Sequence, residues 1–166
     1  VQPLVIRVNL GDTVRVRFRN HVDRRLSIHV QGLSYDVNTS DGASVGFNAD
    51  STTAGEIWYT WYADTEGVYL FQDMADPRST EEATNIHGLF GAVIVEAPEA
   101  RWFHPETGEE LTSGLMADIY EPGKPAFREY SIFFHDELEI RNKDGNPPVD
   151  PHTGLPASTT ATVQSR

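Results

Sequence analysis

Hydrophobic and polar residues alternate strictly over residues 13–20, with three apolar side chains on one side of the chain and three arginines on the other. The apolar set is Val14, Val16 and Phe18, and the basic set is Arg15, Arg17 and Arg19. Because successive side chains of a strand point to opposite faces, this pattern predicts an antiparallel strand with one face in a core and the other in solvent.

Other segments also combine apolar or aromatic residues with flanking turn sequences. Further strands are predicted over residues 5–8, 26–31, 57–62, 68–72 and 92–95, with a short strand near 45–47 and a turn of helix within 75–85. Strands at this spacing, with almost no helical periodicity, predict an all-β fold, a Greek-key β-sandwich.

The composition changes after Ala97, where prolines and glycines become frequent. Residues 98–126 are predicted to be a surface linker without regular ladders, because proline lacks the backbone donor that a ladder needs. Residues 127–134 again resemble a strand, and the proline-containing end of the chain is predicted to be extended. The expected organisation is one domain over 1–97, an interdomain linker over 98–126, and over 127–166 the opening strand of a following domain plus an extended tail.

Composition excludes several classes of function. The net charge of −12 argues against binding nucleic acid, whose phosphates would repel the chain. The absence of cysteine excludes disulfides, zinc ribbons, thiolate catalysis and a mononuclear blue-copper centre in this chain. No apolar run approaches the roughly 18 residues of a membrane span, and no signal peptide is recognisable, so the chain resembles a mature or truncated piece.

The charges are unevenly distributed along the sequence. Six arginines and two aspartates lie between Arg7 and Arg25, whereas residues 26–97 carry one arginine and eleven acidic residues. A basic edge beside an acidic body favours contact with neighbouring domains or subunits. The alternative is a solvated strand face.

A histidine lies within the stretch Leu26-Ser27-Ile28-His29-Val30-Gln31-Gly32. Residues two apart on a strand share a face and lie about 6.6 Å apart along it, so a His-x-His pair there can hold adjacent metals. The second position here is Gln31. Taken alone, His29 is either the remaining ligand of such a pair or a hydrogen-bonded histidine at the end of a sandwich strand.

Several motifs in linked order resemble a known family. They are Pro3-Leu4-Val5-Ile6, Gly11-Asp12-Thr13-Val14, Asn20, Leu26-Ser27-Ile28-His29 and Gly32-Leu33, then Trp58-Tyr59-Thr60-Trp61, Gly67-Val68-Tyr69-Leu70-Phe71-Gln72 and the run 87–95, and finally the run 127–137. Together they resemble a cupredoxin domain of the multicopper oxidases, nearest to the ceruloplasmin and hephaestin branch and its bacterial relatives. The resemblance implies a cupredoxin-like sandwich or barrel, followed by the opening strand of a second cupredoxin domain.

The resemblance also implies where copper ligands should fall. In this family, four His-x-His pairs from two domains hold a trinuclear copper cluster that reduces dioxygen, and a blue-copper site accepts electrons from the substrate. On that pattern His29 matches the first ligand of one pair and Gln31 replaces the second. Gln72-Asp73-Met74 falls where the partner pair would lie, and Leu26 falls where the blue-copper site would offer its first histidine. We therefore expect copper in the parent enzyme and none in this chain.

The densest set of hard-metal ligands is His135-Asp136-Glu137, with Glu139 beyond it. On a continuing strand three of these residues share one face, a candidate site for calcium or an oxidisable divalent metal. The resemblance offers the alternative of a structural acidic pair between domains.

Three other groups have plainer explanations than chemistry. The first is an acidic loop, which either attracts cations or is solvated. The second is His87, which is expected to pack or to form a hydrogen bond. The third is an aromatic run, which is expected to serve the core and an interface rather than to bind sugar. The loop contains Asp73, Asp76, Glu81 and Glu82, and the aromatic run is Trp58, Tyr59, Trp61 and Tyr62.

The family resemblance implies a segment of a multidomain oxidase that couples oxidation of a metal ion or small reductant to dioxygen reduction. This domain would be mainly a scaffold, inactive alone. Its partners would be other cupredoxin domains of the same polypeptide or other chains, in an extracytoplasmic (secreted or periplasmic) location. The alternatives are a non-enzymatic interaction module with the cupredoxin fold, and a site at His29 that a neighbouring chain completes.

Overall fold

The structure is a computed structural model that describes residues 2–43, 55–75, 84, 88–134, 142, 144–147, 149 and 152–154. Every regular element in these residues is a strand, which confirms the all-β prediction for the described part of the chain. None of the described residues forms a helix that could cross a membrane. The strand expected near residues 45–47 and most of the segment 75–85 lie outside the described residues.

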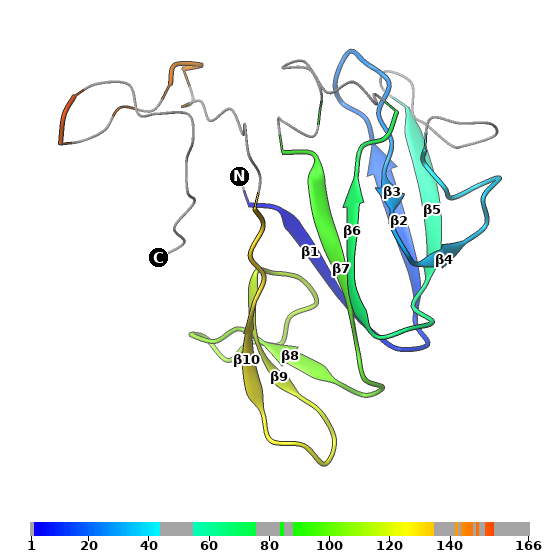
Figure 1. Ribbon diagram of the computed structural model, residues 1–166, viewed down its shortest axis with the longest axis vertical. Helices are drawn as coiled ribbons and strands as arrows, with labels where there is room; N and C mark the ends of the chain where they lie inside the picture. Colours follow the sequence, from blue (N-terminus) through cyan, green and yellow to red (C-terminus); the bar gives the residue numbers. More distant parts are fainter. Residues whose placement is uncertain are drawn as a thin grey trace.

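Two sheets pack face to face as a β-sandwich, as the sequence predicted (Figure 1). The first has the order β1-β7-β6-β3, in which β1 (Leu4–Asn9) runs parallel to β7 (Phe90–Glu96), while β6 (Gly67–Gln72) and β3 (His29–Val30) continue the sheet antiparallel. The second has the order β2-β5-β4 and consists of β2 (Thr13–Arg19), β5 (Glu56–Tyr62) and β4 (Ser34–Tyr35).

The core lies between the two sheets and follows the predicted alternation. Val14 and Phe18 of β2 are buried, whereas the three arginines between and beside them are exposed. Tyr59 and Trp61 of β5 are completely buried against Phe71 and the inner residues of β7. The aromatic run on β5 therefore serves the core with every second residue, as its spacing predicted.

The predicted strand over residues 26–31 is much shorter in the structure, where only His29 and Val30 form β3. The backbone N–H of Ser27 donates to Asp73 Oδ1 at 2.8 Å, and that of Ile28 to the Tyr59 hydroxyl at 3.3 Å. The side chains of Asp73 and Tyr59 thus bind the backbone N–H groups that would otherwise bond to a neighbouring strand. The chain therefore joins the sheet only at His29.

A third sheet of order β10-β9-β8 lies beside the sandwich, next to β1, whose backbone bonds to residues 112–114 (Figure 1). It consists of β8 (Arg101–Phe103), β9 (Met116–Tyr120) and β10 (Phe127–Tyr130), all antiparallel, around buried Trp102 and Ile119. The expectation that residues 98–126 form no regular ladder is therefore wrong. Prolines lie only before β8 and in the connections, so each short strand keeps its donors. The assignment of 98–126 as an interdomain linker stays a prediction.

Arg7 joins the third sheet to the sandwich. Its side chain is completely buried, and Nη1 lies 2.7 Å from Glu129 Oε1 of β10 while Nη2 donates to the Gly114 carbonyl at 3.2 Å. The Arg7 backbone N–H also donates to the Thr112 carbonyl at 2.8 Å. Arg7 is thus neither part of an exposed basic edge nor on a solvated face, because the segment after the sandwich folds back over it.

Candidate functional site

His29 lies at the edge of the first sheet, where β3 pairs with the end of β6. Its Nδ1 is 2.7 Å from the Asp41 carboxylate and 2.9 Å from the Asp41 carbonyl oxygen. Both oxygens are acceptors, so Nδ1 carries the hydrogen and, in the neutral ring, Nε2 keeps the lone pair. A carboxylate that holds a histidine in this way is the usual support of a metal-binding imidazole.

Asp41 belongs to the loop after β4 and is held by Tyr35 as well. The Tyr35 hydroxyl donates to Asp41 Oδ1 at 3.1 Å, and its ring packs edge-on against the His29 ring with centroids 6.1 Å apart. Burial raises the pKa of Tyr35, with smaller contributions from the hydrogen bond and charge of Asp41, so the hydroxyl stays a donor. Neither Asp41 nor Tyr35 was predicted from the sequence to belong to this site.

Gly42 allows this loop to lie against the start of β3. Its φ is +76°, and a Cβ built on it would lie 2.1 Å from the Ile28 carbonyl oxygen. Only glycine fits such a close approach in the left-handed region. An aspartate followed by glycine in a loop of small polar residues is the sequence signal that could have identified Asp41.

Glutamines occupy the neighbouring positions. Gln72 lies directly across from His29 in the strand register, and its Nε2 donates to Met74 Sδ at 3.4 Å. Gln31 has an exposed side chain, while its backbone N–H donates to the Leu70 carbonyl at 2.8 Å. Amide oxygens suit hard cations, whereas copper in proteins favours imidazole and sulfur ligands.

Asp73 is buried and saturated by protein donors. Its Oδ1 accepts from the Ser27 N–H at 2.8 Å, the Ser27 hydroxyl at 3.3 Å and the Ala75 N–H at 3.0 Å. Its Oδ2 accepts from the Thr84 hydroxyl. Asp73 is therefore neither solvated nor open to cations, which corrects the expectation for this residue. The other three acids of that loop lie outside the described residues.

The donors around His29 do not fit a trinuclear copper cluster. They supply one imidazole, two amides, the Met74 thioether and two carboxylates, of which Asp41 is bonded to His29 and Asp73 is saturated by protein donors. In the described ranges, no group of three or more His, Cys, Asp or Glu residues is arranged to hold a metal ion. Leu26, which the family resemblance aligned with a blue-copper ligand, is buried in the core.

The second candidate set, His135, Asp136 and Glu137, lies outside the described residues together with Glu139, and so does His87. The proposed hard-cation site stays a prediction.

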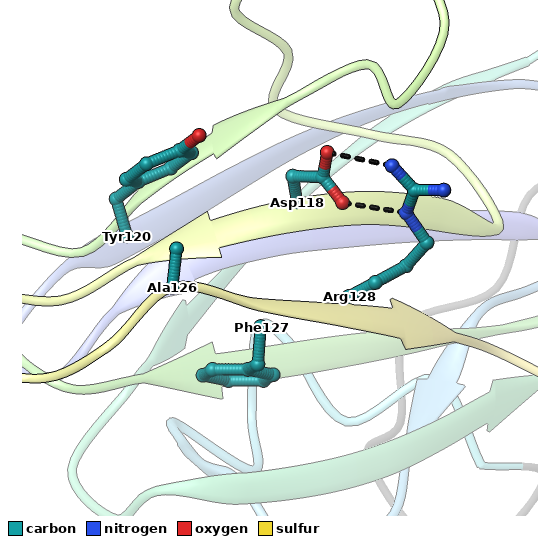
Figure 2. Close-up of a pocket in the computed structure, with 5 residues that line it drawn as sticks. All are labelled: Asp118, Tyr120, Ala126, Phe127 and Arg128. Carbon is teal, nitrogen blue, oxygen red and sulfur yellow. Dashed lines mark hydrogen bonds and ion pairs between the residues drawn. The ribbon is translucent and has the colours of Figure 1, made fainter.

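A shallow depression of about 330 Å³ lies on the third sheet, on different strands from His29 (Figure 2). Asp118 and Arg128 form a two-pronged ion pair in it, with N–O distances of 2.7 and 2.9 Å, beside Tyr120 and Phe127. Arg128 lowers the pKa of Asp118. The pair joins β9 to β10, and the depression offers no nucleophile or free base.

Known proteins resemble the sandwich part of the chain. A family profile described as multicopper oxidase matches residues 3–100. The multicopper oxidase elcG of Phaeosphaeria nodorum is 23% identical over 95 residues, which are 57% of this chain and 14% of that protein. A probable nitrite reductase-hydroxylamine oxidoreductase fusion protein of Kuenenia stuttgartiensis is 33% identical over 95 residues, 55% of this chain and 11% of that protein.

Among solved structures, Lac15 from a marine microbial metagenome aligns with a TM-score of 0.49 and 25% identity, over 73% of this chain and 35% of that one. A multi-copper oxidase from Pseudomonas Parafulva aligns with a TM-score of 0.48 and 27% identity, over 57% of this chain and 22% of that one. Because the family profile covers more than half of the sequence, the chain belongs to the multicopper oxidase family.

Proposed function

We propose that this chain is a supporting segment of a multidomain multicopper oxidase whose working coppers are held by other domains. The parent enzyme would couple one-electron oxidation of a metal ion or small reductant to the reduction of dioxygen. The observation that supports the scaffold role is the single imidazole at His29, flanked by Gln31 and Gln72 and by an aspartate that protein donors saturate. One imidazole without chelating neighbours gives weak and unselective copper binding.

The proposal includes the organisation of the parent polypeptide. Residues 98–126 would connect two cupredoxin domains, and residues 127–166 would open the second, so that the partners of this segment are other cupredoxin domains. The extracytoplasmic (secreted or periplasmic) location rests on the family resemblance alone.

Copper titration of the chain tests the scaffold role. After loading with Cu(I) or Cu(II) and desalting, metal analysis is expected to find well below about one copper per chain. The Gln31→His variant restores a His-x-His pair and should raise copper affinity at least about tenfold, because two imidazoles then chelate the ion. Gln31→Asn, which adds no imidazole, is the matched control. Stoichiometric tight copper in the unaltered chain, with a blue or near-ultraviolet charge-transfer band, would refute the scaffold role.

The adjoining sequence of the parent polypeptide separates the oxidase from the alternative function. Complete His-x-His pairs and a cysteine-containing blue-copper loop in neighbouring domains support the oxidase. Their absence would favour a non-enzymatic interaction module with the cupredoxin fold.

A further inference from the structure

The outer face of the β2-β5-β4 sheet carries a cluster of arginine and aromatic side chains. Arg17 lies directly across from Trp58 in the strand register, and Arg19 lies across from Glu56. We call this cluster the arginine–tryptophan face. It comprises Arg15, Arg17 and Arg19 of β2 and Glu56, Trp58 and Tyr62 of β5.

Trp58 lies at the centre of this face and is held in place from two sides. The guanidinium carbons of Arg15 and Arg17 lie 5.0 and 5.6 Å from its ring centre. Its indole N–H donates to Glu56 Oε1 at 3.2 Å, yet 47% of the residue is exposed. A large ring that is fixed before binding loses little conformational entropy when a partner covers it.

Two of the three arginines share one carboxylate. Glu56 Oε2 lies 2.9 Å from Arg17 Nη2 in an ion pair and accepts a hydrogen bond from Arg19 Nε at 2.8 Å. These two interactions, that of Arg17 first, lower the pKa of Glu56 to about 2. Among the described residues, Arg15 has Trp58 as its contact and no ion pair. Three positive charges against one negative charge leave this face with a surplus of two, on a chain whose net charge is −12.

The third sheet offers a direct comparison. There, Arg101 is paired with Glu110 and Arg128 with Asp118, so each exposed arginine has its own carboxylate. Arg101 also lies over an aromatic ring, 5.0 Å from the centre of Phe103. Stacking of a guanidinium on a ring thus occurs on both faces, and of these arginines Arg15 is the one for which the described residues provide no carboxylate.

We propose that the arginine–tryptophan face docks an acidic polypeptide surface, with carboxylates bound by the arginines and an apolar group placed over Trp58. Trp, Tyr and Arg are the residues that most often carry binding energy in protein interfaces. The guanidinium fork matches the two oxygens of a carboxylate. Since the rest of the chain is acidic, it repels an acidic partner elsewhere and directs it to this face.

A second copy of the chain is a poorer occupant. A contact between the basic face of one copy and the acidic body of another uses two different surfaces, and such contacts continue into open chains unless the rotation closes. The proposal is also independent of copper, so a failed scaffold role leaves it intact.

The test uses the whole chain and a fluorescent extended peptide of alternating glutamate and valine. Anisotropy at low salt is expected to show binding of this peptide and none of the version with glutamine in place of glutamate. Arg15→Gln combined with Arg17→Gln should weaken binding at least about tenfold, and Trp58→Ala should weaken it as well. Arg101→Gln removes a stacked, exposed arginine from the other sheet and is the matched control, with an expected change below about twofold.

Glu56→Gln gives a change in the opposite direction. This variant frees the guanidinium groups of Arg17 and Arg19 to bind the peptide, so the affinity for the peptide should increase several-fold. The affinity should also fall more steeply as salt is added. If the double variant does not fold, the single Arg15→Gln variant replaces it, because the described contact of Arg15 is with Trp58 alone.

Three results would overturn the proposal. The first is no binding of the glutamate peptide at low salt, or an equal loss in Arg101→Gln. The second is tighter binding of heparin than of the glutamate peptide, which would mean that the face binds any polyanion and does not recognise a polypeptide. The third is sedimentation of the chain as a dimer that Arg15→Gln abolishes, which would assign the face to a second copy.

Discussion

A single carboxylate holds the entry to β3 against the end of β6. Asp73 is 4% exposed and accepts hydrogen bonds from Ser27, Ala75 and Thr84. Asp73→Ala leaves these buried donors without an acceptor, so we expect a loss of about 3–5 kcal/mol in the free energy of unfolding, measured by urea denaturation. Asp64→Ala is the control, since its exposed carboxylate accepts from Ser34 and should contribute below about 1 kcal/mol. Equal losses in the two variants would contradict the role given to Asp73.

The environment of His29 could be predicted only in part from the sequence. That His29 lies on a strand, and that the residue two positions on is Gln31 and not a second histidine, follow from residues 26–32 alone, because both depend on local spacing. The support from Asp41 and Tyr35 does not, since it depends on a loop that returns over β3 only because Gly42 has no side chain. The burial of Asp73 is equally non-local, as its donors come from Ser27 and Thr84, on either side of it in the sequence.

At the scale of elements, the ion pair of Arg7 and Glu129 connects β1 to β10. The two atoms are 2.7 Å apart as an ion pair without aligned hydrogen-bond geometry, and Arg7 Nε has no acceptor. Removing one partner of a buried pair leaves an uncompensated charge, so Arg7→Met should cost about 3–5 kcal/mol of unfolding free energy. Arg7→Met combined with Glu129→Met should recover much of this loss. Arg17→Met, which breaks an exposed pair, is expected to cost below about 1 kcal/mol. A double variant no more stable than Arg7→Met would argue against this pairing.

A further carboxyl group, Glu96 at the end of β7, is influenced by the charges at this junction. Burial first, and then the charges of Glu129 and Glu121, raise the pKa of Glu96, while Arg7 opposes the shift. A carboxyl whose folded-state pKa is raised stabilises the fold below its ordinary pKa of 4.5, and this contribution is lost as the pH rises through the folded-state value.

Glu96→Gln should therefore increase the melting temperature at pH 7, by a few °C at most, and leave it nearly unchanged near pH 4. Thermal denaturation followed by circular dichroism at both pH values measures the effect. Glu110→Gln, whose pKa is lowered by Arg101 instead, is the control and should not increase the melting temperature at pH 7. An equal increase for Glu96→Gln at both pH values would contradict the role of ionisation.

Five strands of the sandwich, β1, β2, β5, β6 and β7, were predictable because each carries its signal within six or seven residues, whereas β4, with two residues, was not predicted. The alternation of β2 and the aromatic spacing of β5 place the same residues in the core that the sequence indicated. Two strands of the third sheet were missed, because β8 has three residues and β9 five, too few to show a strand period between prolines and glycines, whereas β10 lies within the strand predicted over 127–134. These strands form because they pair with each other and because the segment between β8 and β9 bonds to β1. No local sequence pattern contains such contacts.

At the scale of the whole molecule, the chain leaves an apolar row exposed beyond the third sheet. Tyr130, Ile132 and Phe134 alternate along the chain and are 56%, 69% and 93% exposed, whereas Phe133 between them packs on Phe90 with ring centroids 5.7 Å apart. Strand-like alternation with the apolar side in solvent is a feature of a segment that is covered in a larger assembly. It supports the proposal that residues 127–166 open a following cupredoxin domain.

This proposal predicts an effect that depends on the length of the polypeptide. Ile132→Ser combined with Phe134→Ser should change the unfolding free energy of the 166-residue chain by below about 0.5 kcal/mol, because both side chains are exposed. In the longer polypeptide that the proposal assumes, the same change should cost about 3–5 kcal/mol, since two large apolar side chains would lose their burial in the next domain. Val22→Ser with Val37→Ser, two isolated exposed apolar residues outside the strands, is the matched control and should be neutral in both lengths. Denaturant unfolding of the six proteins gives the answer, and equal, small effects of Ile132→Ser with Phe134→Ser in both lengths would mean that this row does not begin a further domain.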